Sequence, residues 1–172
     1  MTATQLVCAF CGYAVAFVAI AYLARANGRR TLGALVGAAV AATYFLGVLN
    51  LGLRSGWWRV PLPSDAGLQT LFYATTAVSL APIYPVTWRL VRRFSWRGLV
   101  VSLIAATVIG PPRDYLVGML YPQWVTFSPG LGPILAVSAT YFGVVGIGHI
   151  TMWLVSGPAN QDRLFQRQRG TA

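Results

Sequence analysis

The chain has 172 residues, of which 56% are hydrophobic and only 9% are charged, and its mean hydropathy is +0.62. Soluble domains carry about 25% charged residues, so this composition excludes a water-soluble globular domain and predicts a polytopic membrane protein surrounded by membrane lipids. The net charge is +10, but the basic residues are all arginines in short clusters between apolar runs. Without one contiguous basic face we expect no nucleic-acid partner.

Apolar runs of about 20 residues, the length needed to cross a bilayer, follow one another along the chain. The first covers about residues 4–24, and it is too long for the apolar core of a cleavable signal peptide. The second covers about residues 32–53, the third about residues 68–90 and the last about residues 131–156. We therefore expect one transmembrane domain, residues 1–157, followed by a basic cytoplasmic tail, residues 158–172.

The segment at about residues 99–121 is interrupted by GPPRDYLVG at positions 110–118. Neither half is long enough to cross alone, whereas together they have the length of one span. Pro111 and Pro112 remove backbone donors and crowd the preceding turn, so we predict a single fourth helix kinked at Pro111-Pro112. A re-entrant hairpin would instead leave the basic tail outside. The predicted fold is an all-α bundle of five transmembrane helices.

The arginines indicate how such a bundle is oriented. With the N-terminus outside and the C-terminus inside, ten arginines lie on the cytoplasmic side and only Arg54, Arg59 and Arg113 lie outside, as the positive-inside rule requires. We expect a multi-pass protein of the cell (plasma) membrane. The tryptophans fall near the two predicted interfaces: Trp57, Trp58 and Trp124 outside, and Trp88, Trp96 and Trp153 inside.

Arg113 and Asp114 are the strongest candidates for a functional site. At a rise of about 1.5 Å per residue, Arg113 lies about 22 Å along a hydrocarbon core about 30 Å thick, in its outer third. Ionisable residues at such depth commonly mark function. The alternative is a salt bridge at the interface, with the Arg113 side chain extended to the headgroups.

Other polar residues share this depth, whereas the middle of each span is mostly Ala, Val, Leu, Ile and Gly. This pattern predicts a pocket with a polar end and apolar walls that opens outward. Asp114 would be its polar centre or general acid, and Arg113 its partner or an anion anchor. The expected ligand-binding residues are Asn50, Tyr73, Tyr115 and Trp124.

Motifs for known chemistries are sparse. Glutamate is absent, which leaves no carboxylate pair for acid–base catalysis, and we expect no metal and no cofactor.

Cys8 and Cys11 have CxxC spacing, but cysteine is also a common apolar filler in helices. His149, the only histidine, is more typical of a hydrogen-bonding residue than of a haem ligand. Gly33 and Gly37 form a GxxxG pair, and the segment at 143–149 is also rich in glycine; each pattern predicts close helix packing.

The segment RDYLVGMLYPQWVTFSPGLG at 113–132 resembles the membrane-type lycopene (carotenoid) cyclase domain. The positions that carry the resemblance are Asp114, Trp124, Phe127, Pro129 and Gly130. Arg113 stands where that family has Trp, and PILAVSATYF replaces its acidic Pro-Leu-Glu-Glu element. The resemblance implies an isoprenoid-sized ligand, whereas the missing glutamates argue against cyclisation itself.

The predicted function is therefore an integral membrane protein that binds, and on one hypothesis transforms, a lipid or an isoprenoid (terpenoid)-like hydrophobic small molecule. One alternative is a non-catalytic accessory subunit of a larger membrane complex. The other is a small channel or transporter subunit. Homo- or hetero-oligomers are compatible with each of these.

Overall fold

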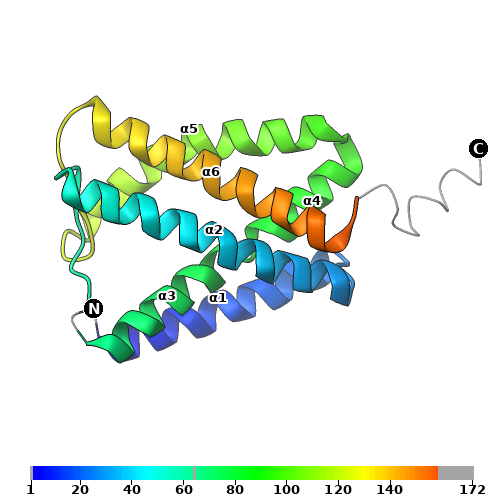
Figure 1. Cartoon of the computed structure of the whole chain (residues 1–172), viewed down its shortest axis with the longest axis horizontal. Coiled ribbons are helices and arrows are strands. Elements are labelled where there is room, and N and C mark those ends of the chain that lie inside the picture. Colours follow the sequence, from blue (N-terminus) through cyan, green and yellow to red (C-terminus); the bar gives the residue numbers. More distant parts are fainter. Residues whose placement is uncertain (1, 64, 159–172) are drawn as a thin grey trace, which may run out of the picture.

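The computed structural model describes residues 2–63 and 65–158, and it is all-helical apart from two short strands. The helices are α1 (Ala3–Leu23), α2 (Gly28–Arg54), α3 (Ala66–Leu80), α4 (Ile83–Phe94), α5 (Trp96–Leu120) and α6 (Leu131–Ser156). Strands β1 (Trp58–Arg59) and β2 (Thr126–Phe127) pair antiparallel. Figure 1 shows the helices running lengthwise, with both strands at the end where the N-terminus lies. We call this the strand end, and the other the arginine end.

Polar residues at the ends of the apolar runs cap the helices. Thr2 and Gln5 form a capping box at the start of α1, and the side chain of Asn27 accepts a hydrogen bond from the Arg30 backbone at the start of α2. Asp65 accepts from the backbone N–H of Leu68 at 2.9 Å. Such caps satisfy N–H groups that have no partner within the helix. One of the two described carboxylates is thus used for capping.

The region expected as the third span forms two helices rather than one. Pro82 and Pro85 lack backbone N–H groups, and Ala81 closes α3 by donating its N–H to the Val78 carbonyl at 3.2 Å. Neither α3 nor α4 has the length that a single span needs. The pair nevertheless carries the chain from the strand end to the arginine end (Figure 1).

Four helices, α1, α2, α5 and α6, are each long and apolar enough to cross a membrane, which indicates a multi-pass membrane protein. Their bounds lie within about four residues of the expected spans. Helix α5 runs through Pro111 and Pro112 as one element. The kink itself stays a prediction.

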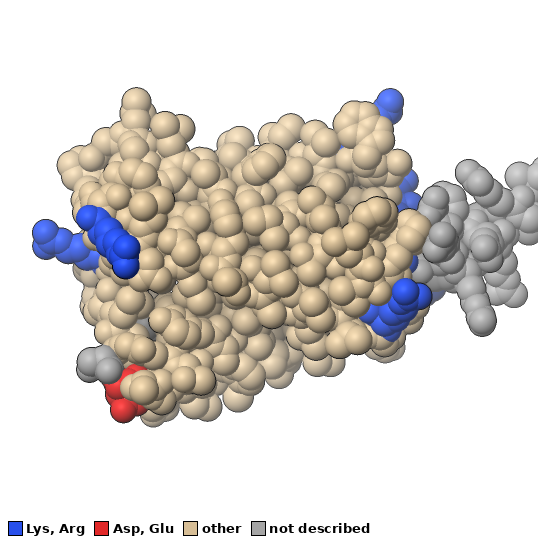
Figure 2. Space-filling model, in the orientation of Figure 1, with Lys and Arg blue, Asp and Glu red and all other residues tan. Residues whose placement is uncertain are grey.

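Charged side chains lie at the two ends of the bundle, and the face between them carries none (Figure 2). Helix direction places seven described arginines at the arginine end: Arg25, Arg29, Arg30, Arg89, Arg92, Arg93 and Arg97. The three at or toward the strand end are Arg54, Arg59 and Arg113. The expected cytoplasmic tail lies outside the described residues from 159 onward.

Helices α2 and α6 pack closely at their glycines, as small residues predict, and the structure shows that these two helices are each other's partners. A Cβ atom on Gly33 or Gly37 would overlap α6, in the latter case at the Gly148 carbonyl. Gly148 in turn leaves room for the ring of Tyr84, which is fully buried and donates its hydroxyl proton to the Val144 carbonyl at 3.1 Å. The GxxxG pair therefore brings two spans together, as small residues do in lipid.

Two tryptophans expected at the membrane interfaces are instead part of the protein interior. Trp58 is 5% exposed and donates its indole N–H to the Leu49 carbonyl at 3.1 Å, and Trp88 is 4% exposed. Trp96, Trp124 and Trp153 remain exposed. The positions of Trp58 and Trp88 in the sequence predicted the correct end of the bundle for each ring. They did not predict that the rings point into the protein.

Candidate ligand-binding cavity

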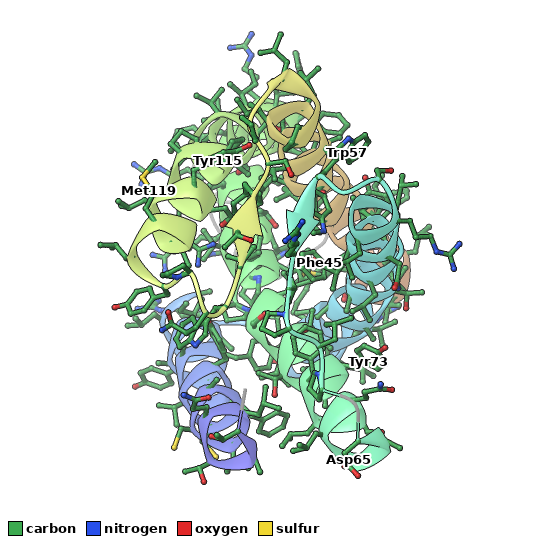
Figure 3. The ribbon with its side chains drawn as sticks, turned by 90° about the vertical axis from the view of Figure 1, so that its left-hand side faces the viewer. Phe45, Trp57, Asp65, Tyr73, Tyr115 and Met119 are labelled. Carbon is green, nitrogen blue, oxygen red and sulfur yellow. The ribbon has the colours of Figure 1, made fainter. Side chains whose placement is uncertain are left out.

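A cavity of about 550 Å³ lies inside the half of the bundle toward the strand end. Every helix contributes to its wall, and residues of the two strand segments complete the lining. Most of the lining is aliphatic or aromatic, including Phe45, Leu49, Phe72, Val137 and Val144. Figure 3, which looks onto the strand end, shows Phe45 near the centre of the bundle and the labelled Tyr73 and Met119 on its outer sides.

The two strands cover the cavity from the strand end. Trp58 pairs with Phe127 across the ladder, and the two rings meet edge-on with centroids 6.2 Å apart. The Ser128 backbone N–H donates to the Trp57 carbonyl at 2.9 Å, which extends the connection by one residue. Tyr115 of α5 stacks on Phe127 at 4.6 Å. Two loops that are distant in sequence therefore form one aromatic cover over the cavity.

One polar cluster faces this apolar space. The Arg113 guanidinium donates to the Tyr141 hydroxyl at 2.8 Å and to Asp114 Oδ1 at 3.2 Å. The Tyr141 hydroxyl donates to the same Oδ1 at 2.8 Å. All three residues line the cavity. Because both bonds to the carboxylate end on Oδ1, Asp114 Oδ2 has no hydrogen-bond partner among the described residues.

The remaining hydroxyl groups in the lining of α3 and α6 are already bonded within their own helices. Thr76 donates to the Phe72 carbonyl at 2.9 Å, and Ser79 donates to the Thr76 carbonyl at 2.7 Å. Thr140 donates to the Ala136 carbonyl at 2.7 Å. Such bonds to the preceding turn leave a helix-borne hydroxyl with little to offer a ligand. The Arg113–Tyr141–Asp114 cluster is therefore the principal polar feature of these walls.

Gly110 and Pro111 explain how α5 positions this cluster. Both are buried, and a Cβ atom on Gly110 would overlap the Tyr141 ring of α6, with Cγ only 2.6 Å away. The absence of a side chain at position 110 lets the tyrosine ring lie flat against α5. Its hydroxyl then reaches Arg113 and Asp114 about one turn further along. The GPPRD segment thus combines a space for the ring with the charged pair that binds it.

The structure brings together three of the predicted site residues, namely Arg113, Asp114 and Trp124. The other three are absent from the cavity lining. Asn50 is exposed and donates to the Leu46 carbonyl at 2.9 Å, and Tyr73 is exposed beside Phe72. Tyr115 belongs to the aromatic cover, and its hydroxyl is buried without a hydrogen-bond partner.

Tyr141 is the residue that sequence reasoning missed. Its only signal is a polar ring in the middle of the apolar run of α6, 27 residues from Asp114. A pairing at this separation depends on how α5 and α6 are rotated against each other. Periodicity in one sequence does not report that rotation.

Other candidate groups lie away from this cavity. Cys8 and Cys11 are free thiols exposed on α1. His149 is buried, and its Nδ1 lies 2.9 Å from the Thr87 hydroxyl, which matches the expected hydrogen-bonding role. Within residues 2–63 and 65–158, no three His, Cys or Asp side chains gather as a metal site requires.

Comparisons of the chain with protein-family models, curated proteins and solved structures find no match.

Proposed function

We propose that the chain crosses the cell membrane five times, with α3 and α4 together forming the third span. The N-terminus lies outside and the C-terminus inside. Two observations support this topology: the α3–α4 pair joins opposite ends of the bundle, and seven of ten described arginines lie at the end assigned to the cytoplasm. A bias of this kind sets orientation during insertion.

We propose further that the cavity beneath the strands binds a lipophilic molecule, a lipid or an isoprenoid-like compound, that carries one polar group. The observation that carries this proposal is the combination of about 550 Å³ of mostly apolar-walled space with one charged pair, Arg113 and Asp114. Sites for small molecules typically enclose about 300–1,000 Å³ and use a few polar groups to orient the ligand. A purely structural salt bridge would not need such space beside it.

The cluster suits a hydroxyl or carbonyl group on the ligand. Asp114 Oδ2 is an open acceptor, and the Arg113 guanidinium has five N–H donors, more than its bonds to Tyr141 and Asp114 use. A ligand hydroxyl would donate to Asp114 and accept from Arg113. Hydrogen bonds to charged groups contribute about 1.5–3 kcal/mol each, so each of these two bonds would account for roughly tenfold to hundredfold in affinity.

The cavity lining also bears on the choice between a straight-chain and an isoprenoid-like ligand. Asp114, Trp124 and Phe127, three of the positions that resemble the lycopene cyclase domain, lie around the same space. Aromatic rings from β1, β2 and α3 suit a branched, unsaturated chain. This supports an isoprenoid alcohol or ketone, with Asp114 as the polar centre or, on the catalytic hypothesis, as the acid.

The test uses phytanol, a saturated isoprenoid alcohol, and phytane, the hydrocarbon of the same skeleton that lacks only the hydroxyl group. Each is added to membranes before purification, and the molecules retained per protein are counted by mass spectrometry. The wild-type chain should retain about one phytanol and much less phytane. Asp114→Asn should lower retention of the alcohol and leave phytane unchanged, because it alters only the polar end.

A second pair of variants tests the cavity itself. Val137→Phe adds a ring to a lining residue and should abolish retention of both compounds, whereas Val108→Phe adds the same ring to a side chain that is 64% exposed on α5. The second variant should behave as the wild type. Equal retention in Val137→Phe and wild type would refute a ligand in this cavity. A co-purifying protein without any lipophilic molecule would favour the accessory-subunit alternative.

A further inference from the structure

A second cavity, of about 760 Å³, opens at the arginine end of the bundle. The corner between α4 and α5 forms one side, and the start of α2 and the end of α6 form the other. Four arginines line it: Arg30, Arg92, Arg93 and Arg97. It is separate from the cavity beneath the strands and shares no lining residue with it.

The charge around this cavity is strongly unbalanced. The two acidic residues of the described part, Asp65 and Asp114, belong to the strand end. The third acidic residue of the sequence, Asp162, lies outside the described residues. One carboxylate neutralises only one of four guanidinium groups. At least three positive charges therefore remain for an anion from elsewhere.

Two of the guanidinium groups are held at the same aromatic ring. Arg30 lies 5.2 Å and Arg92 lies 4.7 Å from the centroid of Trp88, so the two cations are no more than about 10 Å apart. Trp88 and Arg30 are both buried, and Arg30 also donates to the carbonyls of Gly157 and Pro158. Trp88 therefore holds Arg30 and Arg92 on one side of the cavity.

The local backbone keeps these side chains around one opening. The chain turns between α4 and α5 at Ser95, which has a φ of 58°. Gly98 packs against the backbone of Leu90, where a Cβ atom would overlap the carbonyl group. The tight corner folds Arg97 back toward Arg92 and Arg93, although they belong to different helices.

Apart from Ser95 and His149, the rest of the lining is apolar, and part of it is exposed on the outside of the bundle. Val101, Phe94 and Trp153 line the cavity and are 63%, 51% and 49% exposed, respectively. A site for a water-soluble anion has no need of such a surface. A phospholipid needs both parts: cations for the phosphate and apolar side chains for the acyl chains. The cytoplasmic leaflet, which this end faces in the proposed topology, carries anionic lipids.

We propose that this cavity binds the headgroup of an anionic phospholipid, with its phosphate held by Arg92, Arg93 and Arg97. Guanidinium groups bind phosphate oxygens through paired hydrogen bonds. The acyl chains would lie against Val101 and Trp153. Binding at this site is independent of the ligand beneath the strands.

The experiment uses the full-length chain in nanodiscs of phosphatidylcholine containing one-tenth phosphatidylglycerol. Retained lipids are identified by native mass spectrometry after transfer to detergent. The wild-type chain should retain phosphatidylglycerol well above its share of the bilayer. Basic residues near a membrane surface contribute about fivefold each, so Arg92→Gln/Arg93→Gln/Arg97→Gln should weaken retention on the order of a hundredfold. Unchanged retention in this variant would overturn the proposal.

Further measurements test whether retention is specific to this cavity and to a membrane lipid. Arg54→Gln/Arg59→Gln removes charge at the strand end and should retain the lipid as the wild type does. If the triple variant fails to fold, Arg97→Gln alone serves, since Arg97 is exposed and its loss should cost about fivefold in retention.

Glycerol 3-phosphate at millimolar concentration should not displace the lipid. Displacement would show that the cavity recognises a soluble phosphate compound, and it would overturn the assignment to a membrane lipid.

Discussion

Replacing Gly110 with alanine should uncouple Tyr141 from the charged pair. The added Cβ atom would lie 2.6 Å from Tyr141 Cγ, whereas ordinary van der Waals contact begins at about 3.4 Å. The ring must therefore move by about 1 Å, or α5 must separate from α6. Either movement stretches the two hydrogen bonds at the Tyr141 hydroxyl, both 2.8 Å long, beyond effective range.

The expected cost has two parts. Overpacking a closely packed interface costs about 1–3 kcal/mol, and hydrogen bonds between membrane helices contribute about 0.6 kcal/mol each on average. Together these predict a loss of about 2–4 kcal/mol in the free energy of unfolding. Tyr141→Phe removes only the hydroxyl group and should cost about 1 kcal/mol. The difference between the two variants isolates the steric contribution.

Unfolding in mixed micelles, titrated with a denaturing detergent and followed by circular dichroism, measures these free energies. The matched control is Gly146→Ala on α6, because a Cβ atom there would meet only the Leu103 side chain at 3.7 Å. This control should remain within about 0.5 kcal/mol of the wild type. If Gly110→Ala were equally neutral, the ring would not depend on the glycine, and our account of the GPPRD segment would fail.

Two further predictions concern the bundle and its orientation. Gly37→Leu should destabilise the protein by at least about 2 kcal/mol in the same titration, because its side chain would collide with the Gly148 backbone; Gly47→Leu on the same helix meets open space and should be tolerated. In a cysteine-free background, a membrane-impermeant maleimide applied to intact cells should label Gln123→Cys but label Ser95→Cys only after lysis. The opposite pattern would reverse the proposed topology.

The two cavities suit different kinds of ligand. The one beneath the strands has a single, internally paired charge cluster, and it suits a mostly apolar molecule with one polar group. The one at the arginine end has excess positive charge and apolar side chains open to lipid. If both are occupied, one small bundle holds a lipophilic ligand near the outer leaflet and an anionic phospholipid at the inner leaflet. A substitution in one cavity leaves the other lining unchanged, because no residue belongs to both linings.

The limits of sequence reasoning are clearest at the third expected span. Pro82 and Pro85 were visible as interruptions, yet hydrophobic length alone indicated one helix over residues 68–90. The structure ends α3 at Leu80 and begins α4 at Ile83. Hydropathy indicates that a segment prefers lipid, but it has the same value whether the segment forms one helix or two. Backbone hydrogen bonding around the prolines decides between them.

The amino-acid sequence by itself determined that lipid surrounds the chain, the approximate bounds of the four long apolar helices α1, α2, α5 and α6, and the separation of arginine clusters from apolar stretches. These properties depend on composition and on position along the chain, because each residue's depth follows from its distance to the end of its helix. Only the tertiary structure decided which faces meet. It placed Tyr141 against Gly110, turned Trp58 and Trp88 inward, and left Asn50 and Tyr73 outside the cavity lining. The rotation of each helix depends on packing against all the others at once, and no single apolar run contains that information.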